Sequence, residues 1–126
     1  ILLVKEVTDE LWTLPGGYAD VGLSPAENVE KEVQEEAGIT VKASHLYSIR
    51  HKAKGDYDAD IRDFYKLFFL CESCGVQEPS AGHETSEAQY FSRDDIPPLS
   101  TGRVLMEDLL LAWEFSNSSS KQALFD

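Results

Sequence analysis

A helix whose two ends are both marked constrains this chain more than any other feature. Ser24 stands where an N-cap belongs, with Pro25 at the first helical position and Glu27 completing a capping box. Gly38 can take the left-handed conformation that ends a helix. The pattern predicts a helix over residues 25–37. Its apolar stripe, spaced for packing on a core, consists of Ala26, Val29, Val33 and Ala37.

Three glutamates, Glu32, Glu35 and Glu36, share one face of this helix, beside the apolar stripe. At about 100° per residue they fall within an arc of roughly 100°, and like charges at this spacing destabilise a helix. One interpretation is a solvated acidic face. The other is a site for a hard divalent cation, because Mg²⁺ and Mn²⁺ bind carboxylate oxygens. Crowding should raise the pKa values of these carboxyl groups until a cation binds.

A glycine loop leads into the helix. Residues 11–14 predict a short apolar strand, and Pro15, Gly16 and Gly17 follow directly. Paired glycines permit close approach of the backbone to a ligand. A strand, a glycine loop, a capped helix and an acidic face thus follow one another, which favours the cation site.

This arrangement resembles the Nudix hydrolases, whose box is a Gly, five residues, Glu, seven residues, then Arg-Glu-U-x-Glu-Glu-x-Gly-U, with U aliphatic. Laid on residues 17–39, the box matches at seven of nine fixed positions. The matching residues are Gly17, Glu32, Val33, Glu35, Glu36, Gly38 and Ile39. Leu23 replaces a Glu, and Lys31 replaces an Arg and lacks the planar fork that grips a carboxylate bidentately.

The resemblance implies an α/β fold, a Nudix-type α/β/α sandwich with a mixed β-sheet between helices, as a single domain over residues 1–126. It implies an Mg²⁺ or Mn²⁺ site at Glu32, Glu35, Glu36 and Gly17, and a catalytic base among Glu32, Glu35 and Glu84. Nudix enzymes often supply a further glutamate from outside the box, which makes Glu84 and Glu87 candidates. The candidates for substrate binding are Gly16, Tyr18, Arg50, His51 and Glu87.

The stretch "ADVGLSPAEN" (residues 19–28), Leu23 included, resembles a bacterial subgroup acting on nucleoside diphosphates linked to another moiety X, such as ADP-ribose or CDP-choline. The implied reaction cleaves the pyrophosphate bond to a nucleoside monophosphate and a phosphorylated X. Two alternatives stay open. One is a Nudix-fold module that binds a nucleotide or a protein without turnover, and the other is a nucleoside triphosphate pyrophosphohydrolase.

Composition limits the partners. A formal net charge of −12 argues against nucleic acid and anionic membranes. The partner that the resemblance implies is a small nucleoside diphosphate-type substrate, and a homodimer stays open. No apolar run approaches the length of a membrane span. Cys71 and Cys74 are predicted to be ordinary thiols of a cytoplasmic protein. The chain opens on a strand-like segment without Met, so we expect that an N-terminal portion is missing.

The remaining segments predict strands over residues 45–52 and 61–71 and near residues 88–92. A second helix is predicted over residues 102–115, capped by Ser100 or Thr101. Residues 116–126 are expected to form a frayed tail.

Overall fold

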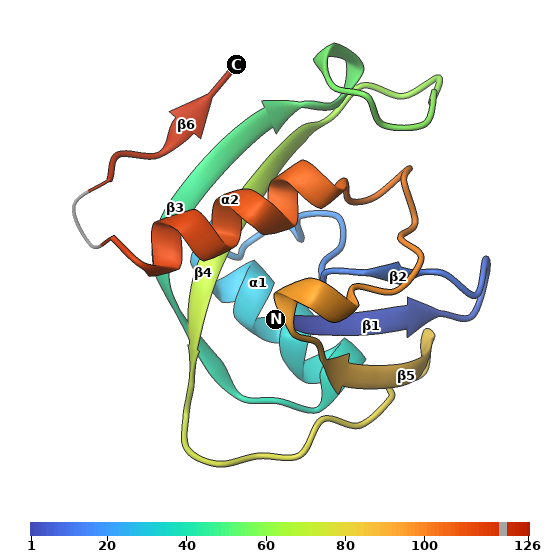
Figure 1. Ribbon diagram of the computed structural model, residues 1–126, viewed down its shortest axis with the longest axis vertical. Helices are drawn as coiled ribbons and strands as arrows, with labels where there is room; N and C mark the ends of the chain where they lie inside the picture. The colour runs from blue at the N-terminus through green and yellow to red at the C-terminus, as the bar shows by residue number, and fades with distance from the viewer. Residues whose placement is uncertain (119–120) are drawn as a thin grey trace.

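Within residues 1–118 and 121–126, which the computed structural model describes, the chain forms two three-stranded sheets and two α-helices (Figure 1). The strands are β1 (Leu2–Glu6), β2 (Trp12–Thr13), β3 (Val41–His51), β4 (Tyr65–Ser73), β5 (Thr85–Tyr90) and β6 (Leu124–Phe125). The helices are α1 (Pro25–Ala37) and α2 (Met106–Ser116), with short 3₁₀ helices η1 (Lys52–Lys54) and η2 (Arg93–Asp95). One sheet has the order β2-β1-β5 and is antiparallel; the other has the order β4-β3-β6, in which only β3 and β6 are parallel.

Helix α1 has the predicted bounds, and local contacts fix both of its ends. Ser24 Oγ accepts a hydrogen bond from the Glu27 N–H at 3.1 Å, and Glu27 Oε1 accepts one from the Ser24 N–H at 3.3 Å. Gly38 ends the helix with φ 67° and donates its N–H to the carbonyl of Gln34. The capping box and the glycine stop are therefore both confirmed.

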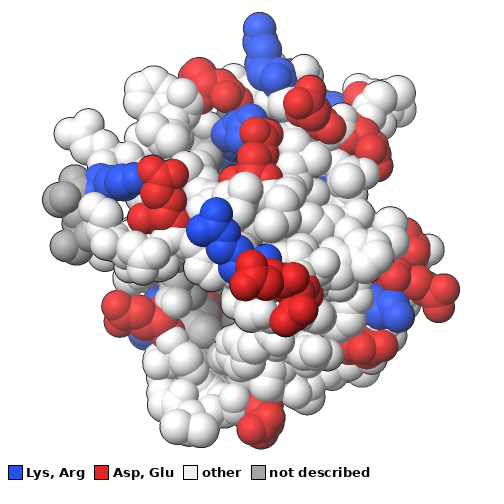
Figure 2. All heavy atoms as spheres, viewed as in Figure 1, with Lys and Arg blue, Asp and Glu red and all other residues white. Residues whose placement is uncertain are grey.

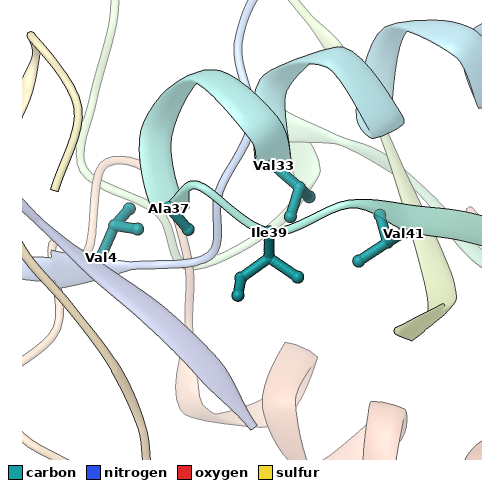
Figure 3. Packing of buried hydrophobic residues seen from close by; sticks show 5 residues of the cluster. All are labelled: Val4, Val33, Ala37, Ile39 and Val41. Carbon is teal, nitrogen blue, oxygen red and sulfur yellow. The ribbon is translucent and has the colours of Figure 1, made fainter. Parts of the chain in front are cut away.

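Strand β1 separates two hydrophobic clusters and so defines the layers. Its neighbours Leu3 and Val4 are both fully buried, and successive side chains of a strand point to opposite faces. Val4 packs toward α1, and Leu3 packs toward α2. The first cluster is Val4, Val33, Ala37, Ile39 and Val41 (Figure 3), and the second is Leu3, Trp12, Val104 and Leu109. The predicted α/β/α sandwich is confirmed, with its strands divided between two sheets.

A third cluster packs α2 on the second sheet. It consists of Tyr47, Phe68, Ala112 and Phe115. The Tyr47 ring lies 5.8 Å from Phe68 and 6.0 Å from Phe115, both measured between ring centroids. Aromatic contacts thus attach the C-terminal half of α2 to β3 and β4.

Several predicted strand bounds shift in the structure. β3 begins at Val41, four residues before the expected start, and β5 begins at Thr85 instead of near residue 88. β4 begins at Tyr65 and not at Ile61, because the preceding residues form a turn. In that turn the Asp60 carboxylate accepts hydrogen bonds from the backbone N–H and the side chain of Arg62, all at 3.0 Å.

The start of the second helix was predicted wrongly. α2 begins at Met106, and neither Ser100 nor Thr101 caps it. Instead Asp108, inside the first turn, accepts a hydrogen bond from the Leu105 N–H at 2.8 Å. The Ser100 hydroxyl donates to Asp9 at 2.6 Å, so it is already engaged with the loop after β1.

The frayed tail expected for residues 116–126 is also wrong where the structure describes it; residues 119–120 lie outside the described residues. α2 continues to Ser116, and β6 pairs in parallel with Ser48 and Ile49 of β3. Asp126 Oδ2 accepts a hydrogen bond from the His51 N–H at 2.6 Å. The last residues are held in place because their backbone pairs with the open edge of β3, which the composition of the segment does not reveal.

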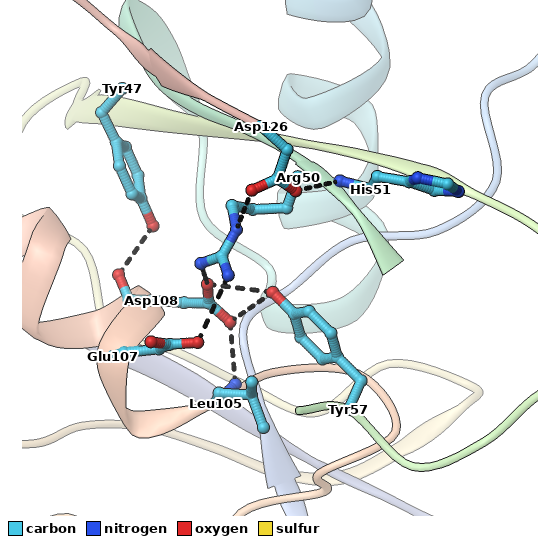
Figure 4. A network of polar contacts seen from close by, with 8 residues as sticks. All are labelled: Tyr47, Arg50, His51, Tyr57, Leu105, Glu107, Asp108 and Asp126. Carbon is cyan, nitrogen blue, oxygen red and sulfur yellow. Dashed lines mark hydrogen bonds and ion pairs between the residues drawn. The ribbon is translucent and has the colours of Figure 1, made fainter. Parts of the chain in front are cut away.

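A polar network under α2 holds the second sheet to the helix (Figure 4). Asp108 is 1% exposed, and the Tyr57 hydroxyl lies 2.8 and 2.9 Å from its two carboxylate oxygens. Arg50 lies 3.4 Å from Asp108, from Glu107 and from Asp126. Burial raises the pKa of Asp108, while its hydrogen bonds with Leu105 and Tyr57 lower it. The network therefore compensates a buried carboxyl group.

Basic side chains on the face seen in Figure 2 lie among acidic ones and form no separate patch there. Of the helices in the described part of the chain, none is long and apolar enough to cross a membrane.

Candidate functional site

The glycine loop after β2 lies directly against α1. The Gly16 N–H donates a hydrogen bond to Glu36 Oε2 at 3.1 Å. A β-carbon at Gly17 would lie 2.7 Å from Glu32 Oε1, closer than real β-carbons come to other atoms. The absence of a side chain at Gly17 is therefore what lets the loop backbone approach Glu32, while Gly16 reaches Glu36 through its N–H.

Lys31 ties the rest of the loop to the same helix. Its ammonium lies 2.7 Å from Asp20 Oδ2 and 3.2 Å from Glu35 Oε1. The hydrogen bond with Asp20, and then that with Glu35, raise the pKa of Lys31. Asp20 is also held by its N–H, which donates to Asn28 Oδ1 at 2.9 Å. Lys31, which stands where the Nudix box usually has Arg, thus connects the loop to the helix.

Glu36 is the buried member of the helix face, with only 5% of its surface exposed. Burial raises its pKa to about 8, the hydrogen bond from Gly16 works in the opposite direction, and the charges of Glu6, Glu32 and Glu84 add to the rise. Burial is likewise the main cause of the raised pKa of Glu32. The raised pKa values were predicted, but the principal cause is burial and crowding comes second.

Glu6 is a site residue that the sequence reasoning missed. It ends β1, is 8% exposed, and has a pKa that burial raises. The pairing register of β1 with β5 shifts between Lys5 and Glu6, an irregularity that can re-aim a side chain. The signal was present in the alternation of β1, because a period of two puts Glu6 on the face of Val4, toward α1.

A loop from outside the box closes over the end of α1 and carries Glu84. The Ser80 N–H donates to the carbonyl of Ala37 at 2.8 Å, and the Thr85 hydroxyl donates to that of Glu36 at 2.7 Å. A β-carbon at Gly82 would lie 1.9 Å from the carbonyl oxygen of Glu35. This close packing explains how Glu84, 48 positions beyond Glu36 in the sequence, comes near the helix carboxylates.

Glu32 and Glu36 contact the glycine loop, the charge of Glu84 acts on both of them, and that of Glu6 acts on Glu36; these four residues are called here the glutamate cluster. The charge of Glu84 raises the pKa values of the other three. In the described part of the chain, no three acidic, His or Cys side chains stand close enough together to ligate an ion in their present conformations. The cluster is accordingly a set of oxygen donors whose mutual repulsion a cation would relieve.

The model of the NUDIX domain matches residues 1–112. The chain belongs to the NUDIX domain family. Members of this family generally depend on a divalent metal ion.

This Nudix domain is similar to proteins with related names. It is 40% identical over 126 residues to the Bacillus subtilis (strain 168) protein named "Putative ADP-ribose pyrophosphatase YjhB", covering 100% of this chain and 60% of that protein. The crystal structure of an ADP-ribose pyrophosphatase from Streptococcus suis 89-1591 superposes with a TM-score of 0.89 at 43% identity, covering 100% of this chain and 89% of that one. A crystal structure titled UDP-X diphosphatase gives a TM-score of 0.86 at 28% identity, covering 100% of this chain and 60% of that one.

The chain spans 57 to 60% of the length of the curated relatives it matches. The family membership and the fold thus apply to the Nudix domain within this chain.

Three residues expected to bind substrate lie apart from the glycine loop contacts. Arg50 is held by Glu107, Asp108 and Asp126 in the network under α2 (Figure 4). His51 Nε2 lies 2.6 Å from Asp63 Oδ1, and Glu87 faces Lys5 at 3.6 Å. These side chains already have charged partners, whereas the glycine loop brings Gly16, Gly17 and Tyr18 to the site.

Proposed function

We propose that this Nudix domain cleaves the pyrophosphate bond of a nucleoside diphosphate linked to another moiety X, releasing a nucleoside monophosphate and a phosphorylated X. The observation that carries the proposal is the contact of the glycine loop with Glu32 and Glu36 of α1, with the charge of Glu84 acting on both carboxyl groups and that of Glu6 acting on Glu36. The names of the similar proteins support this class of substrate, since they include ADP-ribose pyrophosphatases and a UDP-X diphosphatase.

The residues fit a hard divalent cation. All four members of the glutamate cluster offer carboxylate oxygens, two of them from buried positions, and Gly17 leaves the space beside Glu32 that a β-carbon would fill. We keep the predicted assignment of Mg²⁺ or Mn²⁺ to Glu32, Glu35, Glu36 and Gly17, of which Glu32 and Glu36 belong to the cluster and Glu35 lies on the same helix face. When bound, such an ion supplies positive charge for the diphosphate and lowers the pKa of a bound water.

The protein's own groups divide the remaining work. Lys31 holds Glu35 on the exposed side of α1 and fixes the loop through Asp20. Glu32 and Glu84 are the better candidates for the group that accepts the proton of the attacking water. The raised pKa of Glu32 brings it closer to the value that suits a base near neutral pH, and Glu84 stands exposed on the closing loop.

The two departures from the family pattern are compatible with turnover. Lys31 forms ion pairs with Asp20 and Glu35, although its ammonium lacks the planar fork of an Arg guanidinium. Leu23 lies with Glu27 and Lys31 along a shallow hollow on the side of α1. It therefore removes one carboxylate from the loop without breaking the contacts of Gly16 and Gly17 with the helix.

The test is product analysis with ADP-ribose, CDP-choline, NADH and nucleoside triphosphates, each with and without Mg²⁺ or Mn²⁺. Metal-dependent release of a nucleoside monophosphate from one linked diphosphate is expected. Glu36→Gln and Glu36→Lys should reduce kcat at least about 100-fold, because each removes a carboxylate ligand of the cation that acts on the diphosphate. The matched control is Glu78→Gln, at an exposed glutamate of the loop between β4 and β5.

Two other outcomes would contradict the proposal. Cleavage of triphosphates alone would make the protein a nucleoside triphosphate pyrophosphohydrolase. Binding of nucleotides that is insensitive to Glu36→Lys, with no turnover on any substrate, would make it a binding module. A homodimer and a cytoplasmic location remain predictions, which size-exclusion chromatography with light scattering and cell fractionation would check.

A further inference from the structure

Two aromatic rings and a guanidinium lie together at the exposed end of the glycine loop. The rings of Tyr18 and Phe64 are 5.5 Å apart between centroids, with an angle of 36° between their planes. The guanidinium carbon of Arg62 lies 5.7 Å from the Tyr18 centroid and 5.2 Å from that of Phe64. Tyr18 comes from the loop before α1, and Arg62 and Phe64 come from the connection between β3 and β4. We call these three residues the aromatic platform.

The guanidinium of the platform is held in a fixed orientation. Arg62 Nε and NH2 donate to the two carboxylate oxygens of Asp60, each at 3.0 Å, in a bidentate pair. The backbone N–H of Arg62 donates to the same carboxylate. The hydrogen bonds with Arg62 hold the pKa of Asp60 well below its usual range, so the pair stays ionised. Little side-chain freedom is then left to lose when a ligand binds.

The platform is open to solvent and follows the glycine loop directly in the chain. Tyr18 is 64% exposed, so a ligand can reach its ring. It directly follows Gly17, whose backbone lies against the Glu32 carboxylate. Consecutive Cα atoms are about 3.8 Å apart, so the ring begins within one residue of the proposed diphosphate site. This adjacency in the chain is our reason for placing the group attached to the diphosphate at the platform.

We propose that the aromatic platform binds the nucleobase of the substrate by stacking, with Tyr18 as the main contact. This inference rests on the proposed function, because it places the diphosphate at the glutamate cluster. Aromatic rings and a planar guanidinium recognise the π-face that every nucleobase presents. The ribose of ADP-ribose has no π-face, so for that substrate the base is the part that would stack on the platform.

Recognition of this kind has a consequence for specificity. Stacking depends on ring area and tolerates differences in the hydrogen-bonding edge of the base. Purine diphosphates should therefore bind more tightly than pyrimidine diphosphates carrying the same X, by a modest factor. Substitutions at Tyr18 should change the KM values of all of them and leave kcat nearly unchanged, since the reacting phosphates are held elsewhere.

The test measures binding directly, with 1,N6-ethenoadenosine 5′-monophosphate as a fluorescent probe in the presence of Mg²⁺. Stacking on Tyr18 is expected to quench the probe. Tyr18→Ala should raise its Kd at least about fivefold and remove the quenching, whereas Tyr18→Phe, which keeps the ring, should stay within about twofold. Ribose 5-phosphate, titrated by calorimetry, has no base and should bind to all three proteins with the same Kd.

The matched control is Tyr65→Ala, because Tyr65 on β4 is a tyrosine of similar exposure, 77%, and pairs with His51 instead of the platform. It should leave the probe's Kd unchanged. Arg62→Ala should weaken probe binding in the same direction as Tyr18→Ala, and should do so in the Glu36→Gln background, where turnover is lost.

Four results would overturn the role of the platform. In the first two, the wild type fails to bind the probe, or Tyr18→Ala binds it with the wild-type Kd. In the other two, Tyr18→Phe loses as much probe affinity as Tyr18→Ala, or Tyr18→Ala loses as much affinity for ribose 5-phosphate as for the probe. The last two would make Tyr18 a structural link between the loops. A wild type that binds and quenches the probe but hydrolyses none of the panel would reject the proposed function alone.

Discussion

Gly17 stands against the carboxylate of Glu32, 15 positions further along the chain, so closely that a β-carbon would lie 2.7 Å from Oε1. The glycine loop and the acidic face of α1 are thus one structural unit. Geometry at position 17 controls where a helix carboxylate can point.

Gly17→Ala should displace Glu32 and lower kcat/KM about 10- to 100-fold, since errors near 1 Å in a catalytic group have effects of this size. The fold should survive, because Gly17 is exposed and its conformation requires no positive φ. The control is Gly102→Ala, where the nearest atom to a β-carbon is 3.7 Å away. Unaltered kinetics in Gly17→Ala would mean that the Glu32 position is not critical.

The buried Glu36 should make the stability of the metal-free protein depend on pH. Its pKa is raised from 4.5 to about 8, so between these values the folded state binds more protons than the unfolded state. Stability is then fully present below about pH 4.5 and falls as the pH rises toward 8. Glu36→Gln should remove this contribution and be more stable than the wild type at pH 8 by about 1–3 kcal/mol, but not at pH 4.5.

Urea denaturation at both pH values, with chelator present, would measure this difference. Glu78→Gln serves as the exposed control. Glu6 and Glu32 also have pKa values raised mainly by burial, so the Glu36→Gln variant should keep part of the pH dependence of stability. If Glu36→Gln were destabilised equally at both pH values, the carboxyl group of Glu36 would have to be ionised in the folded wild-type protein. Added Mg²⁺ or Mn²⁺ should stabilise the wild type increasingly as the pH rises, because ligands must lose their protons.

The Tyr57 hydroxyl is predicted to stabilise the fold through Asp108. Tyr57→Phe would remove a donor that lies 2.8 and 2.9 Å from the oxygens of a carboxylate that is 1% exposed. Leaving that buried acceptor with fewer partners should cost about 1–3 kcal/mol. Thermal unfolding should show a lower Tm for Tyr57→Phe than for Tyr65→Phe, whose ring is 77% exposed. Equal Tm values for the two variants would indicate that Arg50 and Leu105 satisfy Asp108 without Tyr57.

Gly82 is predicted to be essential for closing the loop that carries Glu84. A β-carbon there would lie 1.9 Å from the carbonyl oxygen of Glu35, a backbone atom that cannot move aside cheaply. Gly82→Ala should therefore push the loop from α1, costing at least about 2 kcal/mol of stability and lowering kcat. Gly102→Ala again provides the control. Crystallography of the variant, or hydrogen exchange at Thr85, would detect the displaced loop, and a loop left in place would refute this role.

The sequence alone determined the local features, because each depends on residues close together in the chain. The cap at Ser24, the stop at Gly38 and the shared face of Glu32, Glu35 and Glu36 follow from helix geometry and were confirmed. The family resemblance rested on the same short stretch, and the predicted sandwich was what that resemblance implied.

The tertiary structure decided everything that joins distant segments. It brought Glu6 and Glu84 to α1 and engaged Arg50 with Asp126. It also formed the hydrogen bond from Ser100 to Asp9, and it paired residues of the expected frayed tail with β3 as strand β6. The physical reason is that burial and long-range hydrogen bonds are properties of neighbours in space. The charge of Glu84 can raise the pKa of Glu36 only after a close-packed loop has placed the two carboxyl groups together.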